Sequence, residues 1–398
     1  MFEIYLFTAF RTAARDSSTV WKRFALLSYI LITAIFYGTI IIGITAGRDF
    51  GLGKFLQGYS ITLFLGFFLM KAIVGSFLFI EDIYRIGHWA IYSFSPKEAG
   101  EVFSNSRKQF LSRVALVVGT IPVLTLLNGA IRSAYNFKVY TQNVKIKNLP
   151  AALKDFHIVQ ISDLHAGSMI FEKRLVEAVE MINELKPDLV FFTGDMVNTI
   201  ADEALPFIDI LKEIKAKYGV FSVLGNHDYG DYHDWKNKED KNANLALLSD
   251  IQSKMGFDLL RNENRIINVE GTKLAVIGVE NWSNRRYFPA YGKLDEAYKG
   301  CSNCAVKLLL SHDPTHWREQ VITHYTDIDI TFSGHTHGFQ FGIEIPWLKW
   351  SPAKYAYPEW AGIYKKAKQY LYVNRGIGHL GYPGRVGILP EISSIKLS

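Results

Sequence analysis

Aspartate, histidine and asparagine recur in five short clusters in the second half of the chain. Any one of them alone is more typical of a turn or a helix cap than of a site. Five in succession, each offering side chains that bind divalent metal ions, indicate a metal centre. The clusters are Asp163-Leu164-His165, Gly194-Asp195, Gly225-Asn226-His227-Asp228, His312 and Gly334-His335-Thr336-His337.

The spacing within the clusters fits a pair of metal ions. Two ions about 3.5–4 Å apart need a ligand that binds both, and Asp195 has that chemistry because a carboxylate offers two oxygens. Asp163 and His165 are two residues apart, so a turn after a strand can direct both at one ion. The same holds for His335 and His337. Glycines that allow close backbone approach precede a predicted ligand in three clusters: Gly194, Gly225 and Gly334.

Such a centre has the chemistry of phosphate ester or anhydride hydrolysis. Two cations lower the pKa of a bound water and hold phosphoryl oxygens while charge moves to the leaving group. His227 can protonate the departing oxygen, and a carboxylate on its other nitrogen would set its tautomer and orientation. A structural histidine is the alternative for His227. The mixture of imidazole, carboxylate and amide ligands suits Mn, Fe or Zn.

The elements expected around these clusters are those of a layered α/β fold. Short β-branched or aromatic runs alternate with longer amphipathic runs from Phe137 onward. Five predicted strands end at a cluster, and ligands of α/β sheets lie at the carboxyl ends of strands. The predicted strands are 156–162, 189–193, 220–224, 274–279, 306–310, 328–332, 370–373 and 393–397, and the predicted helices are 172–185, 201–217 and 235–255.

The blocks SDLHAG, TGDMVN, LGNHDYG and SGHTHGFQ make the second half of the chain resemble the calcineurin-like metallophosphoesterase superfamily. The resemblance covers about 156–337 and implies a four-layer α/β/β/α sandwich with two metals. It implies that His227 faces the substrate and that Asp228 orients it. It also implies two ligand sets that share Asp195: Asp163, His165, Asp195 and His337 for one ion, and Asp195, Asn226, His312 and His335 for the other.

The substrate is less closely defined than the reaction. The blocks look most like a membrane-associated bacterial branch that includes calcineurin-type UDP-2,3-diacylglucosamine pyrophosphatases of lipid A synthesis, which implies a lipid or nucleotide-sugar lipid substrate. Arg375 and Arg385 lie in glycine-rich turns where a guanidinium could bind a substrate phosphate; a surface salt bridge is the alternative for Arg385. An aromatic segment either lines an acyl-chain groove or packs as a lid: Trp347, Trp350, Tyr355, Tyr357 and Trp360.

The first part of the chain has the pattern of a membrane region. Three apolar segments, 24–47, 55–80 and 114–131, are long enough to cross a bilayer as helices, although the second contains Lys71 and the third Pro122. A buried soluble helix is the alternative for the third segment. Met1–Phe10 is apolar but too short to cross, and an interfacial position suits it. We therefore predict a membrane region at 1–135 and a catalytic domain at 136–398.

The distribution of basic residues leaves the side of the membrane open. The positive-inside rule, applied to three crossings of the cytoplasmic membrane, puts the catalytic domain outside the cytoplasm. A miscount of one crossing reverses this, and the resemblance implies the cytoplasmic face. Basic residues gather before the first segment and between the second and third, whereas the intervening loop has two: Arg11, Arg15, Lys22 and Arg23, then Arg85, Lys97, Arg107, Lys108 and Arg113, against Arg48 and Lys54.

Composition agrees with a membrane protein that acts on an anion. Of the 398 residues, 49% are hydrophobic and 21% charged, the net charge is +6 and the pI about 9.0. Cys301 and Cys304, the only cysteines, give no disulfide framework, and we interpret their spacing as an ordinary loop.

The expected partners are therefore a membrane and a phosphorylated small molecule or lipid, with no nucleic acid and no protein partner. Two other functions remain open. One is hydrolysis of a soluble nucleotide or phosphoprotein, and the other is a non-catalytic scaffold with a structural metal site.

Overall fold

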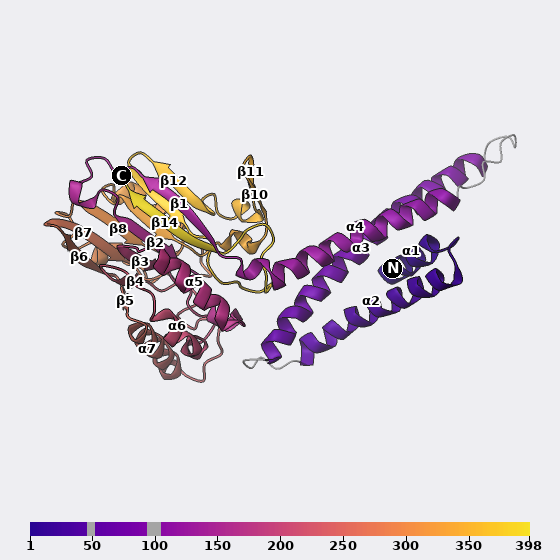
Figure 1. Cartoon of the computed structure of the whole chain (residues 1–398), viewed down its shortest axis with the longest axis horizontal. Coiled ribbons are helices and arrows are strands. Elements are labelled where there is room, and N and C mark those ends of the chain that lie inside the picture. The colour runs from indigo at the N-terminus through magenta and orange to yellow at the C-terminus, as the bar shows by residue number, and fades with distance from the viewer. Residues whose placement is uncertain (46–51, 94–104) are drawn as a thin grey trace. The chain divides into compact units, whose positions relative to one another are not determined.

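The chain folds as two compact units. The structure is a computed structural model that describes residues 1–45, 52–93 and 105–398. The units are Met1–Ile131, which is helical, and Arg132–Ser398, which holds both large sheets (Figure 1). The division falls close to the predicted boundary between 135 and 136.

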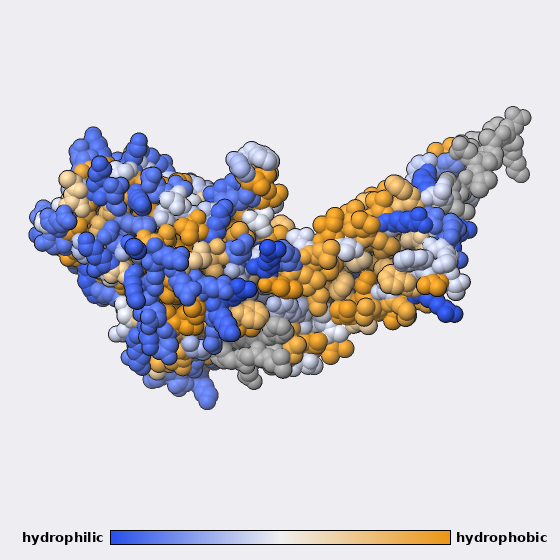
Figure 2. Space-filling model, in the orientation of Figure 1, coloured by the Kyte–Doolittle hydropathy of each residue, from blue (hydrophilic) through white to orange (hydrophobic). Residues whose placement is uncertain are grey.

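The first unit contains three helices that are long and apolar enough to cross a membrane. These candidate spans are Thr19–Thr45, Leu56–Ile91 and Ser106–Tyr135, and each contains one of the three predicted segments as far as those segments are described. Arg48 and Lys97, which entered the charge count, lie outside the described residues. Hydrophobic side chains dominate the visible face of this unit (Figure 2). Its helices are α1 (Phe2–Ala13), α2 (Thr19–Thr45), α3 (Leu52–Ser93) and α4 (Asn105–Ile131), and α4 continues through Pro122.

Helix α1 packs against the three long helices. Its Leu6 and Ala9 are fully buried in one hydrophobic cluster with Met70 and Val74 of α3 and Ala115 of α4. An amphipathic helix stabilised by an apolar face of this kind does not need the length of a membrane span. Met1–Phe10 is therefore a packed part of the helical unit.

The same helix compensates the charge of Lys71. Burial of an unpaired ammonium in an apolar segment is costly, so such a group needs a partner. Lys71 forms an ion pair with Glu3 of α1, and its Nζ lies 3.5 Å from the centre of the Phe36 ring in α2. The lysine inside the second apolar segment thus faces other helices.

The second unit contains two six-stranded sheets. The first has the order β1-β14-β2-β3-β4-β5 and the second β12-β13-β9-β8-β7-β6. Strands β2 to β5 are parallel, as are β7, β8 and β9. Their bounds are β1 Lys138–Val144, β2 His157–Ile161, β3 Leu189–Phe192, β4 Val220–Ser222, β5 Phe257–Leu259, β6 Glu263–Val269, β7 Thr272–Gly278, β8 Val306–Leu310, β9 Ile330–Ser333, β12 Gly362–Lys366, β13 Gln369–Val373 and β14 Glu391–Leu397, with a separate hairpin of β10 (Ile343–Ile345) and β11 (Leu348–Trp350).

The sheets pack face to face and are covered by helices on their outer faces. Phe191 of β3 meets Phe332 of β9 in the central core, with ring centroids 5.0 Å apart. Helices α5 (Glu172–Glu184), α6 (Ile208–Leu211) and α7 (Lys238–Lys254) pack on the first sheet. Helices α8 (Leu294–Ala297) and α9 (Ile322–His324) lie on the second. The predicted four-layer α/β/β/α fold is confirmed.

Some elements differ from the prediction. All eight predicted strands form, but the expected helix 201–217 is a 3₁₀ segment, Ala201–Phe207, followed by the single turn α6. Pro206 lies within it and lacks the N–H that a regular helix requires. Strands β1, β5, β6, β10, β11 and β12 were not predicted. Of these, β1, β6 and β12 are half exposed, without a continuous apolar run. Cys301 and Cys304 are free and buried between the second sheet and its helices.

Candidate metal centre

The two sheets bring all five clusters to one place. Asp163, Asp195 and Asn226 follow β2, β3 and β4 of the first sheet. His312 and His335 follow β8 and β9 of the second. Because parallel strands end at the same edge, residues far apart in the sequence meet there. All seven predicted metal ligands belong to groups that converge at this edge, and we call them the ligand cluster: Asp163, His165, Asp195, Asn226, His312, His335 and His337.

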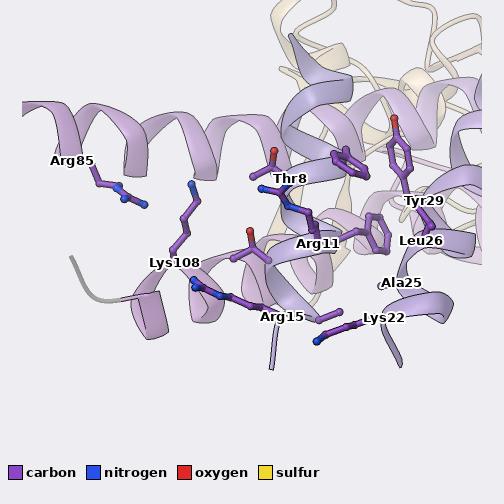
Figure 3. A pocket seen from close by; sticks show the side chains of 13 residues that line it. Thr8, Arg11, Arg15, Lys22, Ala25, Leu26, Tyr29, Arg85 and Lys108 are labelled. Carbon is purple, nitrogen blue, oxygen red and sulfur yellow. The ribbon is translucent and has the colours of Figure 1, made fainter. Parts of the chain in front are cut away.

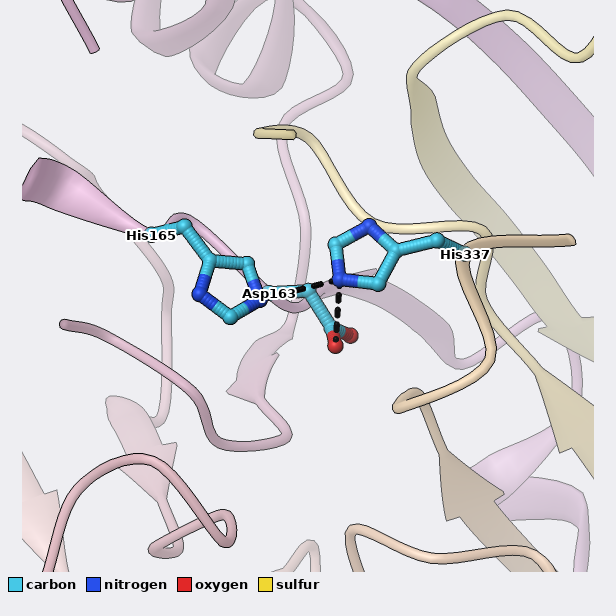
Figure 4. A group of neighbouring side chains, drawn as sticks. All are labelled: Asp163, His165 and His337. Atoms are coloured by element: carbon cyan, nitrogen blue, oxygen red, sulfur yellow. Dashed lines mark hydrogen bonds and ion pairs between the residues drawn. The ribbon is translucent and has the colours of Figure 1, made fainter. Parts of the chain in front are cut away.

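One group in the cluster consists of Asp163, His165 and His337 (Figure 4). The Nε2 atoms of His165 and His337 are 2.9 Å apart, and His337 Nε2 is 3.2 Å from Asp163 Oδ1. All three side chains are buried. Two imidazole nitrogens and a carboxylate oxygen that converge in this way are suitable ligands for one divalent ion.

A second group contains Asp195, His312 and His335. His312 Nε2 lies 3.1 Å from Asp195 Oδ2 and 3.3 Å from His335 Nδ1. Asp195 Oδ2 is also 3.8 Å from His165 Nε2 in the first group. Asp195 therefore stands between the two groups, as a bridging carboxylate must.

Asn226 lines the same cleft as Asp195 and His335. Its Oδ1 is buried and has no hydrogen-bond partner, while its Nδ2 donates to Tyr232 at 3.0 Å. A buried carbonyl oxygen without a partner is unfavourable unless it accepts something, and a cation is a suitable group. The donor set thus fits metal ions with mixed nitrogen and oxygen ligands.

The electrostatics of the cluster also favour positive charge. Burial alone would lower the pKa of His312, but Asp195 beside it raises that pKa to about 10. Burial would raise the pKa of Asp195, but His312 outweighs it and holds the carboxyl well below its usual range. Buried carboxylates that retain their charge need compensating cations nearby.

The backbone is held in an uncommon conformation at the ligands. Five of them have φ in the left-handed region, which for a residue other than glycine costs on the order of 1–3 kcal/mol. Surrounding interactions must hold these residues in place, as is typical of functional sites. The φ angles are 53° at Asp163, 48° at His165, 55° at Asp195, 69° at His335 and 49° at His337.

Glycines make room for the carboxylates, as predicted. A Cβ at Gly225 would lie 2.2 Å from Asp195 Oδ1, and one at Gly334 would lie 2.2 Å from Asp163 Oδ2. No real Cβ makes so short a contact. These two positions require glycine because a ligand oxygen occupies the space of the side chain.

His227 faces the cluster from the side. Its ring centroid is 4.9 Å from that of His165, and its backbone N–H donates to Asp195 Oδ1 at 2.8 Å. Its Nδ1 lies 2.7 Å from the carbonyl oxygen of Asn198 and must donate to it. The other nitrogen, Nε2, is then available to exchange a proton with a substrate oxygen.

Asp228 does not orient His227, contrary to the prediction. Its carboxylate accepts from four backbone N–H groups of the ligand loops, at 2.8–3.2 Å. Asp228 follows His227 in the sequence, but the chain turns between them, so the carboxylate does not reach the imidazole. The Asn198 carbonyl orients the imidazole instead. Because every residue has a backbone carbonyl, this contact could not be predicted from residue types. The four donors are the backbone nitrogens of Asp195, Met196, Val197 and Gly225.

Arg375 does not face a substrate either. It is 2% exposed, pairs with Glu391, and donates to Glu344 Oε1 at 2.5 Å. Its guanidinium stacks on Tyr140 at 4.3 Å from the ring centroid. The predicted phosphate-binding role is wrong because two carboxylates already neutralise this charge inside the fold.

Arg385 is fully buried and is neither a surface residue nor part of the cleft lining. It donates to the carbonyl oxygens of Arg375, Gly376 and Gly378 at 2.5–3.1 Å. Burial lowers its pKa to about 10. The Gly378 N–H in turn donates to the Asp163 carbonyl at 2.9 Å, so Arg385 fixes the loop behind a ligand.

A cleft of about 750 Å³ opens beside the ligand cluster. Five of the ligands and His227 line it, and aromatic side chains form much of the remaining wall. Tyr232, Tyr287 and Phe339 are 45%, 67% and 48% exposed. Such a wall suits a substrate with an apolar part next to its phosphate.

Arg285 is the cation of the cleft that sequence reasoning missed. It donates to the Tyr287 hydroxyl at 3.2 Å and to the Ala356 carbonyl at 2.5 Å. Its guanidinium lies 4.4 Å from the centre of the Tyr357 ring. The residue is in a loop after β7 without a motif, so only the fold places it here. We call Tyr232, Arg285, Tyr287 and Phe339 the cleft rim.

The aromatic segment between Trp347 and Trp360 is divided between two environments. Tyr357 lines the cleft, and its hydroxyl is 2.8 Å from His335 Nε2. Trp360 is buried in a small core with Ala353 and Ile388, whereas Trp347 is 82% exposed. Of this segment, Ala356 and Tyr357 reach the cleft.

The sequence matches phosphoesterase family models along most of its length. Residues 1–134 match the family model "Probable Calcineurin-like phosphoesterase, transmembrane domain", and residues 156–339 match "Calcineurin-like phosphoesterase". A transmembrane protein with metallophosphoesterase domain from Danio rerio is 28% identical, over 81% of this chain and 70% of that protein. The uncharacterized metallophosphoesterase YkuE of Bacillus subtilis is 28% identical, over 73% of this chain and 97% of that one. The Thermus thermophilus sulfate thiohydrolase SoxB aligns with a TM-score of 0.37 and 14% identity, over 63% of this chain and 58% of that one.

The fold and the ligand cluster define a metal-dependent hydrolase. The chain contains a calcineurin-like metallophosphoesterase domain, preceded by an N-terminal transmembrane phosphoesterase domain. It is accordingly a membrane protein whose clustered His and Asp residues are able to hold a metal.

Proposed function

We propose that the chain hydrolyses a phosphate ester or pyrophosphate bond in an amphiphilic substrate, such as a lipid or a nucleotide-sugar lipid. The observation that carries this proposal is the aromatic cleft beside the ligand cluster, together with the transmembrane domain on the same chain. A hydrolysis of the UDP-2,3-diacylglucosamine type, in lipid A biosynthesis, is one reaction of this class.

The residues of the ligand cluster would hold two divalent ions, Mn, Fe or Zn, and Asp195 belongs to both ligand sets. Bound ions of this kind would polarise phosphoryl oxygens and make a nucleophile available near neutral pH. His227 acts from the open side. With Nδ1 held by the Asn198 carbonyl, its Nε2 delivers the proton to the leaving oxygen.

The cleft rim supplies the proposed contacts to the substrate. Arg285 is held at the entrance by Tyr287 and the Ala356 carbonyl, so its guanidinium is oriented before a phosphate arrives. The exposed aromatic rings of Tyr232 and Phe339 would cover the apolar part of the substrate.

The proposed location is the cytoplasmic membrane, which the chain crosses several times through α2, α3 and α4. Their length and hydropathy support this arrangement. The proposed partners are the membrane and the phosphorylated substrate, without a nucleic acid or a protein partner.

A hydrolysis panel with purified full-length protein tests the proposal. The protein would be supplemented with Mn²⁺ and offered nucleotide-sugar lipids, phospholipids, mononucleotides and phosphopeptides in mixed micelles. We expect the highest kcat/KM for an amphiphile. A higher kcat/KM for mononucleotides or phosphopeptides would replace this proposal with the soluble-substrate alternative.

Two neighbouring arginines provide a matched control for the panel. Arg285 lines the cleft, whereas Arg286 is exposed and outside the lining. Arg285→Gln should lower kcat/KM on the preferred substrate, and Arg286→Gln should leave it unchanged. Equal effects of the two variants would show that general charge, rather than a contact in the cleft, attracts the substrate.

A further inference from the structure

A second cavity of about 750 Å³ lies among the helices of the unit Met1–Ile131 (Figure 3). Its lining comes from α1, the residues that follow α1, and the other three helices. We call it the basic pocket because five cationic side chains line it: Arg11, Arg15, Lys22, Arg85 and Lys108.

Among the described lining residues of the basic pocket there is no aspartate or glutamate. Lys108 Nζ is 3.8 Å from Asp82 of α3, but within the described part of the chain Arg11, Arg15 and Lys22 form no ion pair with a carboxylate. Like charges around one cavity repel each other, and this repulsion is relieved when an anion binds between them.

The remaining wall of the basic pocket is apolar. Phe10 of α1 and Leu26 and Tyr29 of α2 contribute to it. Helix α2 is a candidate membrane span from Thr19 onward, so Lys22 lies in its first turn. The cations are thus near the end of a span, at the depth where lipid headgroups lie, and the apolar wall continues along the span.

We propose that the basic pocket binds the phosphate-bearing headgroup of an anionic phospholipid. The phosphate oxygens would accept from the guanidinium groups of Arg11 and Arg15 and from Lys22, and an acyl chain would lie on the apolar wall. This site is separate from the catalytic cleft, which is lined by residues of the other unit. It does not depend on which substrate the enzyme hydrolyses.

Native mass spectrometry of the full-length protein in a zwitterionic detergent tests this proposal. Phosphatidylglycerol and phosphatidylcholine would be titrated in separate samples. We expect tight binding of one phosphatidylglycerol, which phosphatidylcholine does not reproduce. Because a basic side chain near an anionic headgroup contributes on the order of a fivefold change in affinity, Lys22→Gln should weaken binding about fivefold. The triple variant R11Q/R15Q/K22Q should weaken it about a hundredfold.

The neighbour of Lys22 distinguishes a site from general attraction to an anionic surface. Arg23, the next residue of α2, is also exposed but is absent from the pocket lining. We expect Arg23→Gln to bind phosphatidylglycerol like the wild type. An effect equal to that of Lys22→Gln would overturn the proposal.

A conservative variant and a competition with inorganic phosphate complete the test. Lys22→Arg retains the charge and should retain binding, so a loss there would contradict a charge-based site even if the triple variant were unstable. Inorganic phosphate, added at the same concentration as the lipid, should not displace it. Displacement would show that a free phosphate, rather than a lipid headgroup, is the ligand.

Discussion

The ligand cluster and the cleft rim are adjacent, but the protein holds them very differently. The ligands are almost all buried, five of them have left-handed backbone, and Asp228 and Arg385 fix the loops that carry them. In the rim, the rings of Tyr232, Tyr287 and Phe339 are 45–67% exposed. The comparison indicates that the metal-binding residues are built into the fold, whereas the proposed substrate contacts come from side chains that can change without cost to the core.

The largest effect is expected for the bridging carboxylate. Asp195→Asn removes charge from both ligand groups at once. We expect kcat on every substrate to fall about 10⁴-fold, because even partners outside the ligand shell change activity by roughly 10–100-fold. Metal content measured by mass spectrometry should fall with it. Activity that survived at one tenth of the wild-type rate would show that Asp195 does not bridge two ions.

His227→Gln should have the next largest effect. Loss of a general acid typically lowers the rate by about 10²–10⁴-fold, and here the loss should appear in kcat while metal content is retained. Substrates with good leaving groups, such as p-nitrophenyl esters, should be affected least because they need no proton. A uniform loss across leaving groups would instead assign His227 a structural role.

Asp228→Asn tests how the ligand loops are held. The variant loses one of the two oxygens that accept from the backbone of Asp195, Met196, Val197 and Gly225. We expect metal affinity to fall about 10–100-fold, as found for groups behind the ligands. Asp234→Asn, an exposed neighbour, serves as the control in the same metal titration. Unchanged affinity in Asp228→Asn would mean that the loops hold their shape without this carboxylate.

Arg285→Gln should produce a smaller effect, mainly in KM. Removal of one charged hydrogen bond to a phosphate corresponds to about a tenfold change in kcat/KM. The change should be similar for amphiphilic and soluble phosphate esters, because the guanidinium contacts the group they share. A fall in kcat with constant KM would place Arg285 in the reaction itself.

The smallest effect is expected at Phe339, an exposed aromatic ring of the cleft rim. Phe339→Ser should lower kcat/KM about fivefold for an amphiphile, because the contact of an apolar chain with an aromatic ring contributes on the order of 1 kcal/mol. Mononucleotide hydrolysis should not change. An equal loss of kcat/KM on the amphiphile and the mononucleotide would show that the rim does not select the substrate by its apolar part.

The sequence predicted the ligand cluster better than its surroundings. The seven ligands follow strands that are buried on both faces, and such strands have an unmistakable apolar pattern. Polar metal ligands at strand ends stand out against that background. The order of the clusters along the chain was therefore enough to place them at one edge.

The second layer of contacts had no comparable signal. Asn198 acts through its backbone carbonyl, and Arg285 comes from a loop whose course only the folded chain defines. Arg375 and Arg385 looked like phosphate ligands because their glycine-rich turns resemble anion sites. Their carboxylate and carbonyl partners lie up to about thirty residues away in the sequence, for example Glu344.

The pairing of Glu3 with Lys71 has a consequence for how the protein enters a membrane. Residues near the amino end leave the ribosome well before the third helix, so the acidic partner is available when the lysine arrives. Trimming the first thirteen residues would leave an ammonium uncompensated among apolar neighbours, at a cost of about 2.5–3.5 kcal/mol on insertion scales. Helix α1 therefore supplies a counterion that is synthesised before the lysine it pairs with. Shortened forms made for expression should retain this helix.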